Sequence, residues 1–114
     1  MWWKIAGITG ALGVACGAFG AHALQGLETS DKLLHAWEVG ARYHLLHALA
    51  LLAVALHPKP PKIAGGLFVA GILLFSGSLY TMTLTGQSWL GAITPFGGVC
   101  FILGWLSLAF SSRM

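Results

Sequence analysis

The sequence predicts an all-α membrane protein built as a bundle of four transmembrane helices. Of its 114 residues, 57% are apolar and only 8% are charged, whereas roughly a quarter of the residues in an ordinary soluble domain are charged. Four apolar stretches each approach the roughly 20 residues that a helix needs to cross the hydrocarbon core of a bilayer. We therefore expect a single four-helix transmembrane domain over residues 1–114, with spans near residues 3–24, 40–56, 63–83 and 90–110.

The first span, at residues 3–24, is rich in small side chains. Lys4, the apolar run and the motif Ala21-His22-Ala23 also resemble a signal peptide with a small-residue cleavage site. We expect a retained helix instead, because the run is long enough to cross the bilayer core. The polar segment at residues 25–30 then closes this span.

The second helix is expected to begin ahead of its membrane span. Ser30 is a suitable N-cap, and Asp31 places a negative charge in the first turn, near the positive end of the helix dipole. The segment from Asp31 to Val39 is amphipathic, which predicts an outer extension of the helix beyond the span at residues 40–56.

Two breaks define the third and fourth spans. The prolines in the segment 57–62 cannot continue a helix, so the third span is expected to start near residue 63. A polar segment at residues 85–88 separates it from the fourth span. Pro95 stands in the first turns of that fourth helix, where proline is tolerated.

The distribution of basic residues predicts the orientation. With four spans, both termini and the segment 57–62 share one side of the membrane, and that side carries Lys4, Lys59, Lys62 and Arg113. The other side carries fewer basic residues together with all the acidic ones: Lys32, Arg42, Glu28, Asp31 and Glu38. Because basic residues near membrane spans favour the cytoplasm, we expect both termini to be cytoplasmic.

Small residues recur where the helices can meet. Lipid provides no hydrophobic force between helices, so close approach of backbones at glycines contributes much of the packing. We expect helix contacts at Gly10, Gly13, Gly17, Gly20, Gly77, Gly97 and Gly98. The same small faces could also join copies of the chain, so a homo-oligomer is a second interpretation.

Polar side chains gather in the half of the bundle that is expected to face outward. The candidate polar or ligand site comprises His22, Glu38, Arg42, His44, His47, Tyr80 and Thr94. His44 and His47 are three residues apart, so they share a helix face and could ligate one metal ion. Histidine and tyrosine also join membrane helices as purely structural groups, so for His47 both roles stay open.

Four motifs in order along the chain are similar to those of a known family. They are the segment Gly17–Leu24, the spacing Trp37, Tyr43 and His47, the segment Phe75–Tyr80, and the segment Leu90–Gly98 with Gly104-Trp105. This pattern resembles the transmembrane protein 256 family and its bacterial relatives, a family of unknown function. The resemblance implies a small multi-span membrane protein, in bacteria an inner-membrane one, and it implies no activity.

The residues do not predict an enzyme. We find no motif for a catalytic nucleophile, a phosphate-binding loop or a pair of carboxylates, and we expect no catalytic residues, bound metal, cofactor or nucleic-acid partner. Cys16 and Cys100 are expected to be inert packing residues. The favoured function is a non-enzymatic membrane component that interacts with lipids or proteins. The alternatives are a small transporter or channel with a polar site, and a haem, metal or quinone site at the histidines.

Overall fold

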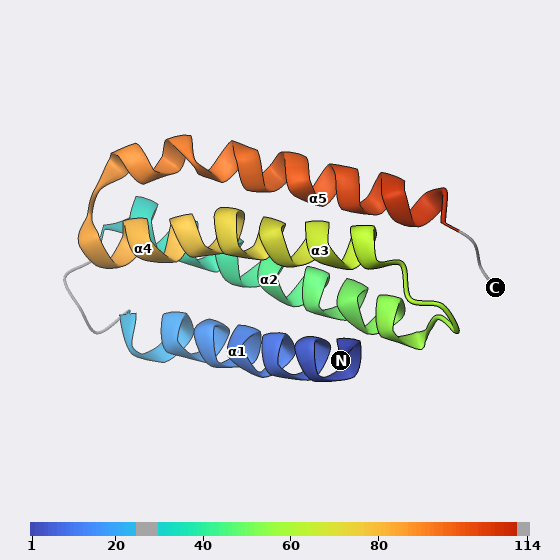
Figure 1. The fold of residues 1–114 in the computed structure, drawn as a ribbon. Helices are drawn as coiled ribbons and strands as arrows, with labels where there is room; N and C mark the ends of the chain where they lie inside the picture. The colour runs from blue at the N-terminus through green and yellow to red at the C-terminus, as the bar shows by residue number, and fades with distance from the viewer. Residues whose placement is uncertain (25–29, 112–114) are drawn as a thin grey trace.

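Four long antiparallel helical segments make up the computed structural model, which describes residues 1–24 and 30–111 (Figure 1). Their elements are α1 (Trp2–His22), α2 (Asp31–Leu56), α3 (Lys62–Gly71), the π-helical turn η2 (Ile72–Ser76), α4 (Gly77–Thr85), the 3₁₀ turn η3 (Ser88–Ala92) and α5 (Thr94–Ala109). All four segments are long and apolar enough to cross a membrane, and the described residues contain no β-strand. The predicted all-α, four-helix membrane fold is confirmed.

The helix ends follow local signals in the sequence. The hydroxyl of Ser30 accepts a hydrogen bond from the Leu33 N–H at 3.2 Å, which confirms the N-cap and the early start of α2 at Asp31. Gly86 ends α4 with φ at 73°, a left-handed conformation that favours glycine. Residues 25–29 of the predicted first loop, including Glu28, and the C-terminal Arg113 lie outside the described residues.

The third span differs from its prediction by one internal turn. It runs without a break from Lys62 to Thr85, but its middle is the π-helical turn η2. At the end of this turn the Ser76 hydroxyl donates a hydrogen bond of 2.6 Å to the carbonyl oxygen of Gly40 on α2. A π turn inserts one residue into a helix and shifts the side chains on either side of it. This contact joins residues far apart in the chain, so local sequence patterns contain no signal for the turn.

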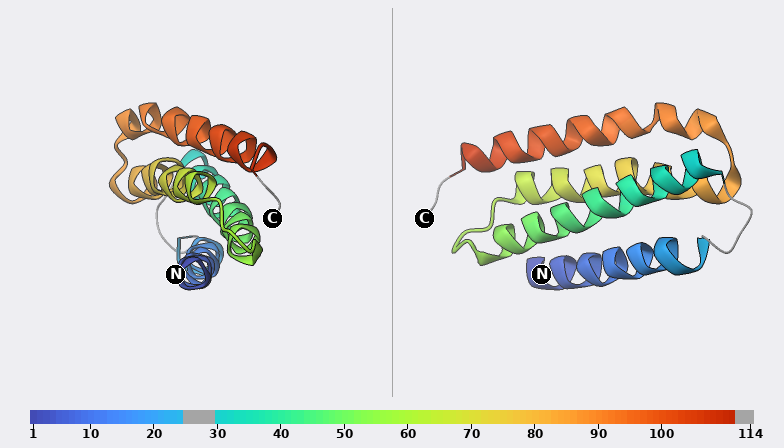
Figure 2. Two further views of the ribbon diagram at one scale, coloured as in Figure 1. Left: turned by 45° about the vertical axis from the view of Figure 1, so that its right-hand side comes forward. Right: turned by 180° about the vertical axis from the view of Figure 1, so that it is seen from behind.

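The helices follow one another across the molecule. α1 packs along α2, α2 packs against α3, η2 and α4, and α5 packs along α3 and η2. Figures 1 and 2 show α1 at one edge and α5 at the opposite edge. The core between α2 and α3 contains the fully buried Leu51, Val54 and Phe68. Because neither edge helix closes over α2, part of its surface is exposed between α1 and α5 (Figure 2, right).

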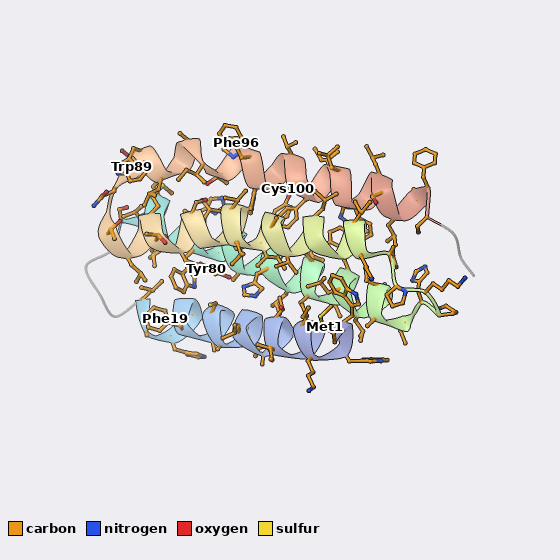
Figure 3. The ribbon with its side chains drawn as sticks, in the orientation of Figure 1. Met1, Phe19, Tyr80, Trp89, Phe96 and Cys100 are labelled. Atoms are coloured by element: carbon orange, nitrogen blue, oxygen red, sulfur yellow. The ribbon has the colours of Figure 1, made fainter. Side chains whose placement is uncertain are left out.

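The two ends of the bundle differ in their residues. Met1, the α2–α3 connection and the last turn of α5 lie at one end, which we call the Lys59 end (Figure 1). The opposite end contains the α4–η3 connection and is called the Gly86 end. Trp89 at the Gly86 end and Phe96 near it point away from the helices, and both are exposed (Figure 3).

Three of the predicted packing glycines lie at very close helix contacts. A Cβ atom added at Gly97 would collide with the backbone of Phe75. One added at Gly13 would lie 2.8 Å from a side-chain carbon of Leu45, and Gly20 faces the indole ring of Trp37. These glycines therefore set the spacing of α5 against η2 and of α1 against α2.

The other predicted glycines have more room. An added Cβ would lie 4.0 Å from Ala48 at Gly10 and 3.9 Å from Phe75 at Gly98. No atom lies within 4 Å of a Cβ added at Gly17 or Gly77. Four further close contacts lie outside this set of glycines, and in each an aromatic ring lies over a glycine of another helix: Gly40 under Tyr80, Gly65 under Trp2, Gly71 under Phe101 and Gly104 under Phe68.

Candidate functional site

His47 is fully engaged in contacts within the bundle. It lies on α2 and is 4% exposed. The Trp105 indole N–H donates to His47 Nε2 at 3.0 Å, so the ring proton is on Nδ1, which donates to the Tyr43 carbonyl oxygen at 2.7 Å. The ring of Phe101 stacks on the imidazole with centroids 3.6 Å apart and an interplanar angle of 11°. Binding a metal or moving a proton through His47 would require one of these hydrogen bonds to break.

His44 belongs to a second group of contacts, between α1, α2 and α4. Its Nδ1 atom lies 2.9 Å from the Tyr80 hydroxyl, which sits on the side of α4 toward α1 (Figure 3). Trp37 packs against the Tyr80 ring with centroids 4.5 Å apart. The indole N–H of Trp37 donates to the Cys16 carbonyl oxygen at 2.7 Å, which ties α1 to α2.

Hydroxyl groups complete the polar contacts between helices. The Ser78 and Thr94 hydroxyl oxygens lie 2.6 Å apart and join α4 to the start of α5. The Thr83 hydroxyl donates to the Leu33 carbonyl oxygen on α2 at 2.9 Å. Across residues 1–24 and 30–111, every buried side-chain nitrogen or oxygen atom has a hydrogen-bond partner. The buried network in the described part of the chain is therefore closed.

The predicted site residues fall into three separate groups. The structure brings His44 to Tyr80 and Thr94 to Ser78, while His47 contacts α5. His44 and His47 face different neighbours, so this arrangement does not offer both rings to one metal ion. The remaining predicted residues are exposed and lie apart from the network: His22, Glu38 and Arg42.

Sequence reasoning did not include Trp105 or Trp37 among the site residues. Both indole N–H groups bond to partners on another helix, 58 and 21 residues away along the chain. Both residues belong to the family motifs, and an indole N–H that leaves water usually needs an acceptor; these are the two signals for them in the sequence. The identity of the acceptor follows only from the packing of the helices.

An open groove runs between α2 and α5. Its volume is about 690 Å³. Aromatic side chains form much of its wall, and His47 and Trp105 form its polar part. The lining residues are Tyr43, Leu46, His47, Leu49, Ala50, Ala53, Phe75, Gly98, Phe101, Ile102 and Trp105. The groove exists because α5 packs on α3 and η2 and leaves the neighbouring side of α2 uncovered.

Comparisons with known proteins match a family of unknown function and relatives that are named membrane proteins. A family model described as "Protein of unknown function (DUF423)" matches residues 16–98. The chain is 50% identical over 107 residues to the UPF0382 membrane protein YwdK of Bacillus subtilis, covering 89% of this chain and 86% of that protein. It is 39% identical over 113 residues to the UPF0382 membrane protein C1782.12c of Schizosaccharomyces pombe, covering 93% and 96%. No solved structure matches.

Proposed function

The chain belongs to the DUF423 family of membrane proteins of unknown function, as its motifs predicted, and from that premise we propose that it is a non-enzymatic membrane component that binds lipid acyl chains in its α2–α5 groove. The observation that carries this proposal is an open, aromatic-walled groove set beside a closed polar network. Its volume of about 690 Å³ lies within the range of about 300–1,000 Å³ that is usual for ligand sites.

The chemistry of the groove suits a hydrocarbon chain. Tyr43, Phe75 and Phe101 line it, and among the described residues that line it none carries a formal charge at neutral pH when histidine is neutral. In a bilayer, a groove that opens sideways between two membrane helices is reached from the lipid phase. An acyl chain there contacts two helices at once, and dispersion contacts summed over many methylene groups stabilise it.

The polar network supports this reading over proton-coupled transport or a haem or metal site. Both His47 ring nitrogens are bonded, one to Trp105 and the other to Tyr43. The Tyr80 hydroxyl lies against His44 rather than in a shared site with His47. Histidines held in this way act as links between helices, as polar side chains in membrane proteins often do.

The groove can be tested by filling it. Ala53 is exposed on α2 and lines the groove, so Ala53→Phe should occupy part of its volume without displacing core side chains. Native mass spectrometry of the protein released from mild detergent should show retained lipid for the wild type. The variant should bind it about tenfold more weakly, the change expected from losing about 1.4 kcal/mol of contact energy.

Ala109→Phe is the matched control for this experiment. Ala109 is exposed on α5 and is not among the residues that line the groove. We expect Ala109→Phe to retain lipid as the wild type does. Equal lipid retention by both phenylalanine variants would contradict binding in the α2–α5 groove.

We also propose that the protein lies in the cell inner membrane with both termini in the cytoplasm. Lys4, Lys59 and Lys62 are all at the Lys59 end, which supports this orientation through the preference of basic residues for the cytoplasm. A green fluorescent protein fused to the C-terminus should fluoresce, and alkaline phosphatase fused there should be inactive. Active phosphatase at the C-terminus would contradict the proposed orientation and place the C-terminus outside the cytoplasm.

A further inference from the structure

One face of α2 carries charged side chains that are exposed between the two edge helices. Glu38 and Arg42 are one helical turn apart on this face, and both are exposed. In Figure 2 (right) α2 lies toward the viewer, between α1 and α5. Further along the helix, Leu46 and Leu49 continue the exposed face with apolar side chains.

Arg42 lies within the expected thickness of the hydrocarbon layer. It precedes Leu56, the last residue of α2, by 14 residues, which at 1.5 Å per residue is about 21 Å. A hydrocarbon core of about 30 Å that begins at Leu56 therefore extends roughly 9 Å beyond the Arg42 Cα atom. A contact with the third span supports this depth. The hydroxyl of Ser76, in the interior of that span, donates a hydrogen bond to the carbonyl oxygen of Gly40, two residues before Arg42 on α2.

A charged group at this depth is unfavourable against lipid. Ionisable side chains in membrane spans usually face protein or water, and they are usually paired with a group of opposite charge. Glu38 and Arg42 are thus an acid and a base one helical turn apart on an exposed helix face.

A hollow beside Glu38 provides the shape to receive a basic side chain. It lies between α1 and α2 and has a volume of about 250 Å³, and Glu38 is the one charged residue among the described residues that line it. Small residues such as Gly17 open its α1 side, and Trp37 forms part of its wall. A guanidinium in this hollow would meet the Glu38 carboxylate, a group that attracts arginine in proteins. We call this space the Glu38 hollow.

We propose that two copies of the chain pair in the membrane, with Arg42 of each copy inserted into the Glu38 hollow of the other. A two-fold axis along the membrane normal gives both copies the same orientation and repeats the contact twice. The charges of the exposed α2 face then neutralise each other across the interface. This pairing goes beyond lipid binding, because its charged contact lies at the Glu38 hollow, on the α1–α2 side of α2. Leu46 and Leu49, further along the same face, also line the α2–α5 groove.

Charge-reversed variants test the pairing directly. Donor- and acceptor-labelled copies in phospholipid vesicles should show Förster energy transfer that increases with the protein-to-lipid ratio. Glu38→Arg gives each copy two basic residues at the interface, and Arg42→Glu gives it two acidic ones. Each variant alone should dimerise at least tenfold more weakly than the wild type, because like charges replace the attracting pairs.

A mixture of the two variants separates pairing between copies from other effects. Donor-labelled Glu38→Arg and acceptor-labelled Arg42→Glu carry complementary charges at both contacts, so their mixture should recover the energy transfer of the wild type. Loss of energy transfer in each variant, without recovery in the mixture, would overturn the proposal. The two charged residues would then act on lipid headgroups, on another protein or on the fold of a single copy. Wild-type transfer in either single variant, or a wild type that stays monomeric, would also overturn it.

A second pair of variants fills the hollow without changing any charge. No atom lies within 4 Å of a Cβ added at either Gly17 or Gly7, so leucine at either position should leave the fold intact. Of these two glycines, Gly17 lines the Glu38 hollow and Gly7 does not. Gly17→Leu should weaken dimerisation at least tenfold, whereas Gly7→Leu should not change it. Equal energy transfer by these two variants would place the contact elsewhere.

Discussion

Replacing Gly97 with alanine is expected to destabilise the protein by about 3 kcal/mol, at the upper end of the usual effect of overpacking. Gly97 is buried in the second turn of α5, where this helix crosses η2. A Cβ atom at this position would lie 2.7 Å from the Cα atom of Phe75 and would also collide with its backbone nitrogen. A backbone held in a helix cannot rotate away as a side chain can, so α5 must separate from η2.

The neighbouring glycine is the control for this prediction. A Cβ added at Gly98 would lie 3.9 Å from a ring carbon of Phe75, its nearest neighbour on another helical segment, which is an ordinary contact distance. Alanine also favours a helix over glycine by about 1 kcal/mol, so Gly98→Ala should be neutral or slightly stabilising. Unfolding by sodium dodecyl sulfate in bicelles, followed by circular dichroism, measures both. Equal stabilities of the two variants would contradict the close contact at Gly97.

His47→Ala is the second substitution with a large expected effect. It removes the ring that stacks on Phe101, leaves the Trp105 N–H without its acceptor, and opens a cavity between α2 and α5. Removing a buried aromatic side chain usually costs about 3–5 kcal/mol, and we expect a loss of about 3 kcal/mol here. Trp105→Phe should cost about 1 kcal/mol, since it removes one hydrogen bond and leaves His47 Nε2 unpaired.

A double-mutant cycle distinguishes a structural His47 from a chemically active one. If the two residues act through their mutual contact, the losses for His47→Ala and Trp105→Phe should not add in the double variant. His57→Ala, in the α2–α3 connection, should change stability by less than about 0.5 kcal/mol. Unchanged stability of His47→Ala would remove the structural role assigned to this histidine.

The sequence was sufficient to predict the number and type of the helices. Apolar stretches of the length of a bilayer core lead to four spans, and Ser30 and the prolines at 58, 60 and 61 mark helix ends through local chemistry. Each of these signals acts within a few residues, so it can be read without a structure. The same reason explains why the early start of α2 was predicted correctly.

The contacts between helices could not be derived in this way. The turn η2 adds one residue to the helical path and ends at Ser76, whose partner Gly40 lies 36 residues away. The pairing of His47 with Trp105 spans 58 residues, and the spacing of histidines suggested a shared face with His44 instead. The lateral grooves depend on which helices lie at the edges, and hydropathy contains no information on that order.

We expect the α2–α5 groove to hold lipid while the histidines beside it stay within a closed network. Solid-state magnetic resonance of the labelled protein in bilayers tests both parts in one spectrum. We expect correlations between acyl-chain methylene protons and the rings of Tyr43 and Phe101, together with a neutral His47 protonated at Nδ1. Correlations from water to the His47 ring, without acyl-chain contacts, would contradict it and would indicate a hydrated path through the protein.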